Sequence, residues 1–153
     1  MVVATTFASN VARLKTLAEA GVAAGRSVCL LGRAMRKMVT TAVETGVLTD
    51  FPALVSPEEA ADIPRQNLML IVTGSQGERR AASAQLSRGK YLGLEMKEGD
   101  SFLFSSKTIP GTDWHPWIYL REVTLLALVG FSLVLGSSEI RQRNGFTYFA
   151  ILE

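Results

Sequence analysis

Residues 73–78 have the composition of a phosphate-binding turn. They read Thr-Gly-Ser-Gln-Gly-Glu and follow an apolar run at residues 67–72. The two glycines permit positive φ angles and a close backbone approach, and successive N–H groups ahead of a helix can bind a phosphate. An ordinary strand-to-helix turn has the same spacing, so both interpretations stay open. The segment lacks the Gly-Lys-Ser/Thr of a P-loop and the spacing of a dinucleotide-binding turn, so ATP and NAD gain no support.

A second polar segment, Ser-Ser-Lys-Thr-Ile-Pro-Gly at residues 105–111, follows another predicted strand. Its hydroxyls and lysine suit phosphate contacts, and a polar turn closed by Pro-Gly is an equally good interpretation. Basic residues also cluster near two predicted helices, as Arg33, Arg36 and Lys37 and as Arg79, Arg80, Arg88 and Lys90. Such clusters are commonly solvated faces, and a net charge of +2 does not require a nucleic-acid partner.

Few residues are candidates for metal or acid–base chemistry. His115 is the single histidine. Together with Asp113 it could supply two metal ligands, whereas a zinc site needs about three or four. No Ser-His-Asp or Cys-His set can be assembled around it. The single cysteine, Cys29, lies in an apolar run and is predicted to be a buried structural thiol. This cysteine usage fits a reducing compartment, so we expect a cytoplasmic protein.

The hydrophobic pattern predicts the elements that would position these segments. Short apolar runs predict strands at residues 2–7, 27–31, 67–72 and 101–105. Helices are expected between them, with Ser9 or Asn10 and Ser56 as N-caps and with ranges near residues 33–45 and 79–88. This alternation predicts an α/β fold, a three-layer, mostly parallel sheet flanked by helices. The loops that follow its strands should share the carboxyl edge, where ligands bind.

The C-terminal part of the chain has a different character. Residues 123–136 are almost entirely apolar, but about 14 such residues fall short of the roughly 20 that span a bilayer. A buried helix or strand pair is therefore favoured over a membrane anchor, within an irregular apolar tail. The whole chain of 153 residues, 48% hydrophobic and 20% charged, fits one compact domain.

Four segments, taken in order, resemble ribonuclease J. They are Thr6-Phe-Ala-Ser-Asn10 with Arg13, Leu31-Gly-Arg-Ala-Met35, Thr73-Gly-Ser-Gln-Gly-Glu78, and Phe104-Ser-Ser106 with Ile109-Pro-Gly111. Each segment is weak alone, but four in this order and spacing are specific. The resemblance predicts a partial β-CASP domain at residues 1–111 and an atypical tail at residues 112–153.

The resemblance implies a fold and an activity for the parent family. Ribonuclease J enzymes are zinc-dependent 5′-to-3′ exonucleases and endonucleases of RNA, in which a metallo-β-lactamase domain holds zinc ions that activate the attacking water. The β-CASP domain is an α/β insertion that closes over the RNA. By resemblance, the expected RNA-binding residues are Ser9, Asn10, Arg33, Gly74, Ser75, Gln76, Ser105 and Ser106.

The sequence also departs from the family pattern. It lacks the His-x-His-x-Asp-His metal signature and the later Ser-Gly-His segment, and after Gly111 we find no resemblance. We therefore expect no catalytic residue, metal ligand or cofactor in this chain, and a β-CASP part that is inactive alone. A stand-alone RNA- or phosphate-binding module is the alternative.

The expected partners follow from the same resemblance. They are RNA and either a full-length ribonuclease or a second copy of this chain, and we do not expect a membrane partner. One hypothesis for the atypical tail is a disrupted or truncated gene, in which residues 112–153 come from a shifted frame or from unrelated sequence.

Overall fold

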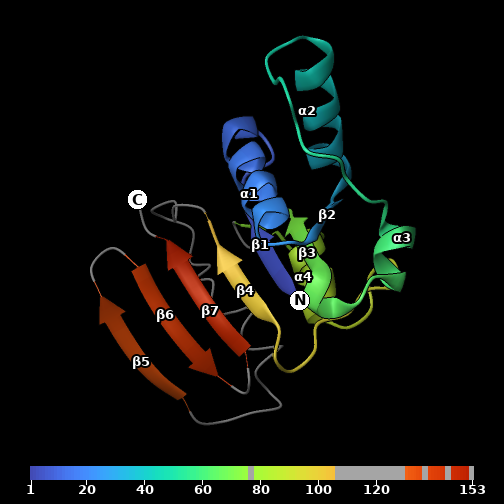
Figure 1. Cartoon of the computed structure of the whole chain (residues 1–153). Helices are drawn as coiled ribbons and strands as arrows, with labels where there is room; N and C mark the ends of the chain where they lie inside the picture. The colour runs from blue at the N-terminus through green and yellow to red at the C-terminus, as the bar shows by residue number, and fades with distance from the viewer. Residues whose placement is uncertain (76–77, 106–129, 136–137, 144–145, 152–153) are drawn as a thin grey trace.

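The computed structural model describes residues 1–75 and 78–105, together with the backbone of residues 130–135, 138–143 and 146–151 (Figure 1). The first strands are β1 (Val2–Thr5), β2 (Ser27–Leu31), β3 (Leu68–Val72) and β4 (Ser101–Phe104). The helices are α1 (Val11–Ala23), α2 (Arg33–Glu44), α3 (Pro57–Asp62), the short 3-10 helix η1 (Arg65–Asn67) and α4 (Ala82–Ser87). The predicted strands are confirmed, whereas the helix predicted at residues 79–88 begins later, at Ala82.

The strands form one sheet in the order β2-β3-β1-β4-β7-β6-β5, with β5 (Gly130–Leu135), β6 (Ser138–Arg143) and β7 (Phe146–Ile151) beyond β4. β1 pairs in parallel with β3 and with β4, and β3 pairs in parallel with β2. β7 is parallel to β4, and β6 is antiparallel to β7 and β5. The predicted mostly parallel sheet is confirmed, and the described part of the tail adds regular strands where an irregular tail was expected.

Two apolar clusters lie on opposite faces of the sheet, because successive residues of a strand point to opposite sides. Ile71 belongs to the cluster that contains Leu14 of α1 and Met35 of α2. Its neighbour Leu70 belongs to the cluster that contains Leu86 of α4 and a residue of α3. Figure 1 shows these helices on the two sides of the parallel strands. The predicted three-layer arrangement is therefore confirmed.

Cys29 lies in the middle of β2 and is fully buried. Burial raises the pKa of its thiol to about 11, while Arg36 acts in the opposite direction and Glu58 and Glu59 act in the same direction as burial. A thiol with this pKa is protonated at neutral pH and is a poor nucleophile. The prediction of a buried structural thiol is confirmed.

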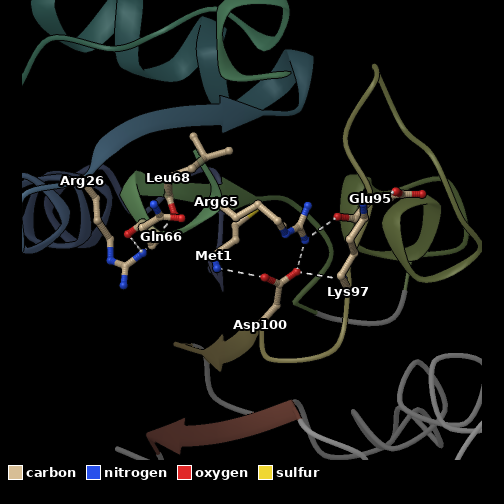
Figure 2. A network of polar contacts seen from close by, with 8 residues as sticks. All are labelled: Met1, Arg26, Arg65, Gln66, Leu68, Glu95, Lys97 and Asp100. Atoms are coloured by element: carbon tan, nitrogen blue, oxygen red, sulfur yellow. Dashed lines mark hydrogen bonds and ion pairs between the residues drawn. The ribbon is translucent and has the colours of Figure 1, made fainter. Parts of the chain in front are cut away.

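Figure 2 shows a polar network at the amino edge of the sheet, centred on Asp100 immediately before β4. One carboxylate oxygen of Asp100 lies 2.8 Å from the α-amino nitrogen of Met1. The other accepts hydrogen bonds from the Arg65 guanidinium and, at 2.8 Å, from the backbone N–H of Lys97. Arg65 also donates to the Glu95 carbonyl at 2.9 Å. These contacts join the segments that lead into β1, β3 and β4.

In the part of the chain that the structure describes, no helix has the length and apolar character needed to cross a membrane. The apolar segment predicted at residues 123–136 is described only in part. Residues 130–135 form strand β5, which agrees with the strand alternative, and the other residues of that segment lie outside the described part.

Candidate functional site

A cavity of about 500 Å³ opens at the carboxyl edge of the sheet. Its wall contains residues 6–8 after β1, residues 32–34 after β2 and residues 73–75 after β3. The chain leaves β1 toward β2 and later leaves β3 toward β4, on the other side of β1. Ligands of open α/β sheets bind at such a switch point, and a volume of about 300–1,000 Å³ is usual for a small-ligand site. The prediction that these three loops share one edge is confirmed.

Charged side chains line this cavity. Arg33 and Arg80 belong to its wall together with Glu78, and both arginines are exposed. Among the residues that the structure describes, neither arginine forms an ion pair. A guanidinium group without a carboxylate partner favours an anionic ligand, and its planar fork matches phosphate oxygens.

Helix α2 begins in the cavity wall without a side-chain cap. Its N-cap is Gly32, and the first turn contains no acidic residue. The N–H groups of this turn have no partner within the helix, and a helix N-terminus carries partial positive charge. Gly32 has φ +135°, and a Cβ here would lie 2.7 Å from the Thr73 side chain. The helix start is therefore kept open by a glycine, and it carries Arg33 as its first residue, an arrangement suited to phosphate.

The loop after β3 is held against the start of α4. The Ser83 hydroxyl donates to the Gly74 carbonyl at 3.2 Å, and the Ser83 N–H donates to the Thr73 carbonyl at 3.0 Å. The Ala82 N–H donates to the Thr73 hydroxyl at 3.3 Å. Because Thr73 engages these two N–H groups, the start of α4 does not offer them to a ligand. Residues 76–77 of the predicted phosphate-binding loop lie outside the described part, so that role of the loop stays a prediction. At α2, by contrast, the N-cap residue Gly32 provides no side-chain hydrogen bond to the first turn.

Two wall residues, Thr6 and Tyr91, were not predicted from the sequence as ligand contacts. Thr6 is 1% exposed, and its hydroxyl has no hydrogen-bond partner in the described part of the chain. An unpaired buried hydroxyl costs roughly 1–3 kcal/mol, so a ligand that reached it would remove a penalty. Tyr91 enters the wall from a turn beyond α4. The sequence signal near it is Gly93, a residue typical of turns.

The structure brings three of the predicted site residues together. Arg33, Gly74 and Ser75 all line the cavity, although they come from loops after different strands. Gln76 and Ser106 were predicted as well, but they lie outside the described residues. The shared position of the first three follows from the parallel sheet, which places both loops at one edge.

The remaining predicted residues lie elsewhere. Ser9 is exposed and is not part of the cavity wall. Asn10 caps α1, its side-chain oxygen accepting the Arg13 N–H at 3.1 Å. Ser105 is buried outside the wall, and its N–H donates to the Thr5 carbonyl at 2.9 Å. Asn10 thus confirms one of the two predicted N-caps, and the Ser105 backbone extends the pairing of β4 with β1.

The described residues do not fit the zinc ions that the resemblance implies for the family. Among them, no group of three or more His, Cys, Asp and Glu side chains could hold a metal ion. Among the described residues of the cavity wall there is one carboxylate, Glu78, and no histidine or cysteine. A zinc site needs about three or four such ligands. The two arginines of the wall suit an anion.

A parallel sheet with helices on both faces and a cation-lined cavity at its carboxyl edge places the chain in the broad class of three-layer α/β domains. Within this class, the family described as "Ribonuclease J, beta-CASP domain" matches residues 1–115. The chain belongs to this family.

Individual relatives agree with the family match. The chain is 43% identical to ribonuclease J of Sinorhizobium meliloti over 109 residues, which are 71% of this chain and 19% of that protein. It is 36% identical to ribonuclease J 1 of Streptococcus pyogenes over 106 residues, 69% of this chain and 19% of that protein. Similarity to ribonuclease J of Corynebacterium glutamicum is lower, 30%, but extends over 148 residues, 96% of this chain and 20% of that protein. The chain thus spans about a fifth of the length of these relatives.

Proposed function

We propose that this chain forms the RNA-contacting β-CASP part of a ribonuclease J-type cleft. The observation that carries the proposal is the uncapped start of α2, with Arg33, in the wall of a cavity at the sheet's switch point. Helix N-termini, backbone N–H groups and arginines are the groups that proteins use to contact the phosphates of nucleic acids. Because the chain belongs to the ribonuclease J family, we take RNA as the nucleic acid that it contacts.

In this proposal a phosphate of the RNA backbone lies against the first turn of α2 and the Arg33 guanidinium. Gly74 and Ser75, in the loop after β3, form the neighbouring wall, where the glycine allows close approach of the sugar–phosphate backbone. Arg80 supplies a second positive charge to the same cavity. These contacts read charge and shape, so they position RNA without selecting a sequence.

Cleavage is not part of what we propose for this chain alone. Exonucleolytic and endonucleolytic hydrolysis in the family is assigned to zinc-binding residues, and this sequence has a single histidine and no His-x-His-x-Asp-His segment. We propose that the chain contributes binding and that the metal-binding half must come from another part of a ribonuclease. Zinc-dependent hydrolysis of RNA by the purified chain would contradict this division.

The test is the affinity of the whole chain for single-stranded RNA, measured by fluorescence anisotropy at several salt concentrations. We expect affinity to fall as salt rises, because each neutralised phosphate releases counterions. Arg33→Ala should weaken binding and reduce the slope of log affinity against log salt by roughly 0.7, the value for one phosphate of a single strand.

The matched control is Lys97→Ala, which removes an exposed cation at the amino edge of the sheet. Lys97 does not line the cavity, so its removal should leave both affinity and salt slope near the wild-type values. Equal losses of RNA affinity in the two variants would mean that binding depends on the total charge of the protein rather than on this site. Binding that is absent, or that does not respond to salt, would exclude the proposal.

A further inference from the structure

Tyr91 is an aromatic wall of the cavity that the phosphate contacts leave unexplained. It lines the same cavity as Arg33 and Ser75 but comes from a separate segment, between α4 and β4. Its side chain is partly buried and packs against the apolar cluster beneath α3 and α4. Packing of this kind restricts the position of the ring beside the cavity that Tyr91 lines.

The turn that carries Tyr91 is held in a demanding backbone conformation. The Tyr91 N–H donates to the Leu94 carbonyl at 2.8 Å, and the Leu94 N–H donates to the Tyr91 carbonyl at 3.0 Å. Between them, Leu92 has φ +52° and Gly93 has φ +82°. Positive φ at both central residues is typical of a type I′ turn, a geometry that the first of them, a leucine, adopts only at a cost. Such conformations persist where the surroundings determine them, and they concentrate at functional sites.

The strained turn has no evident purpose at Leu92 itself. Its side chain is 47% exposed and does not belong to the cavity wall. The result of the turn is that Tyr91, and not Leu92, belongs to the wall. Phe7, after β1, is a second aromatic residue of the same wall. The cavity therefore combines cations and an open helix start with two aromatic rings.

We infer that the cavity receives one unpaired nucleotide of the RNA, with its base stacked on the ring of Tyr91. This inference rests on the proposed function, which supplies the phosphate end of the same nucleotide. Proteins that bind single-stranded RNA combine a positively charged path for the backbone with aromatic rings for unstacked bases. Bases inside a duplex do not offer their faces, so the substrate class is single-stranded RNA. Stacking tolerates every base, so no strong sequence preference follows.

The experiment compares the whole wild-type chain with three variants on a short single-stranded RNA. Tyr91→Leu removes the ring, and we expect it to lower affinity about ten-fold, the scale of one base stacked on an aromatic side chain. Tyr91→Phe keeps the ring and should bind like wild type. Leu92→Ala is the matched control, because it changes the same turn at a residue outside the cavity. It should also bind like wild type.

A set of RNAs with one base removed at successive positions locates the contact. At one position, loss of the base should weaken binding to wild type about ten-fold and leave binding to Tyr91→Leu unchanged, because the missing ring and the missing base are the two halves of one interaction. Salt-dependent binding that is the same for Tyr91→Leu and wild type on every RNA would overturn the inference and leave the proposed function standing. No RNA binding by the wild-type chain would remove both.

Photocrosslinking of the wild-type chain answers the question if Tyr91→Leu does not fold. RNA that contains 5-iodouridine should form an adduct on Tyr91 or on Phe7 when irradiated, and mass spectrometry of the digested chain identifies the site. Adducts confined to residues outside this cavity would also overturn the inference.

Discussion

The two edges of the parallel sheet differ in how their charged side chains are paired. At the amino edge, the Asp100 side chain is 3% exposed and contacts the Met1 amino group, the Arg65 guanidinium and the Lys97 N–H. At the carboxyl edge, Arg33 is exposed at the wall of a cavity, and within the described residues it has no ion-pair partner. The difference indicates that the first edge contributes stability, whereas the second keeps its binding groups available.

Helix starts show the same contrast. At α3, the Ser56 hydroxyl accepts the Glu59 N–H at 3.2 Å, and the Glu59 carboxylate accepts the Ser56 N–H at 2.7 Å, which together form a capping box. At α2, Gly32 offers no such group. A glycine N-cap costs only about a few tenths of a kcal/mol relative to Ser, Thr, Asn or Asp, and it leaves the N–H groups of the first turn available to a ligand.

The largest expected effect comes from removing Asp100. Asp100→Ala leaves the Met1 amino group and the Arg65 guanidinium without their carboxylate, and loss of one partner from a buried ion pair costs about 3 kcal/mol or more. Urea denaturation followed by circular dichroism measures the loss. Glu98→Ala, an exposed neighbour, is the control and should leave stability unchanged. Under conditions in which the Asp100→Ala variant is still folded, its affinity for RNA should equal that of wild type. A lower affinity of the folded variant would show that the two edges are not independent.

A smaller but more local effect is expected for Gly74→Ala at the carboxyl edge. Gly74 has φ +114°, and an added Cβ would lie 1.9 Å from the Ser83 hydroxyl oxygen, so the loop must shift. We expect a loss of about 2 kcal/mol in unfolding free energy, which combines backbone strain with a steric clash. RNA affinity should fall as well, because the displaced loop lines the cavity.

Gly89→Ala is the control that separates these two contributions. Gly89 has φ +136°, but an added Cβ meets nothing within 4 Å. Its substitution should cost only the backbone term, about 1 kcal/mol, and leave RNA affinity unchanged. If the two variants were equally destabilised, the contact with Ser83 would not be what fixes the loop.

Local signals in the sequence were sufficient for the elements of the fold. The run at residues 67–72 is predicted to be a strand with two apolar faces, and β3 forms there with all five of its residues buried between β2 and β1. Ser56 followed by Pro57 and two acids predicts a capped helix, and α3 begins there. Parallel strands then place their following loops at one edge, so Arg33 and Ser75 could be expected near each other without any distance information.

Interactions between distant residues account for what the sequence did not predict. The late start of α4 depends on hydrogen bonds from Ala82 and Ser83 back to Thr73, which no helix propensity encodes. The pairing of Arg65 with Asp100 joins segments that carry no mutual pattern. The capping of α1 by Asn10, by contrast, is a local signal: Asn10 is one of the two N-caps that the sequence predicts there, and it is confirmed.

The smallest predicted effect tests the capped helix start against the open one. The Ser56 N–H, and then its hydroxyl, hold the pKa of Glu59 below its ordinary value of 4.5. A carboxyl group whose pKa is lowered by folding stabilises the folded state above its unfolded pKa, and that stabilisation is lost as pH falls through the folded pKa. Ser56→Ala removes the hydroxyl that accepts the Glu59 N–H, and it should cost about 1 kcal/mol, the usual contribution of an N-cap.

Glu59→Gln identifies the part that titrates, because glutamine keeps the shape of the side chain and removes its charge. The difference in unfolding free energy between wild type and Glu59→Gln should be present at neutral pH and shrink as pH falls below 4.5. Denaturation curves for the two proteins at matched pH values measure it. A difference that stays constant across this range would show that the Glu59 charge does not take part in the cap. The cap on α3 would then rest on the Ser56 hydroxyl alone, which would reduce its contrast with the uncapped α2 to a single hydrogen bond.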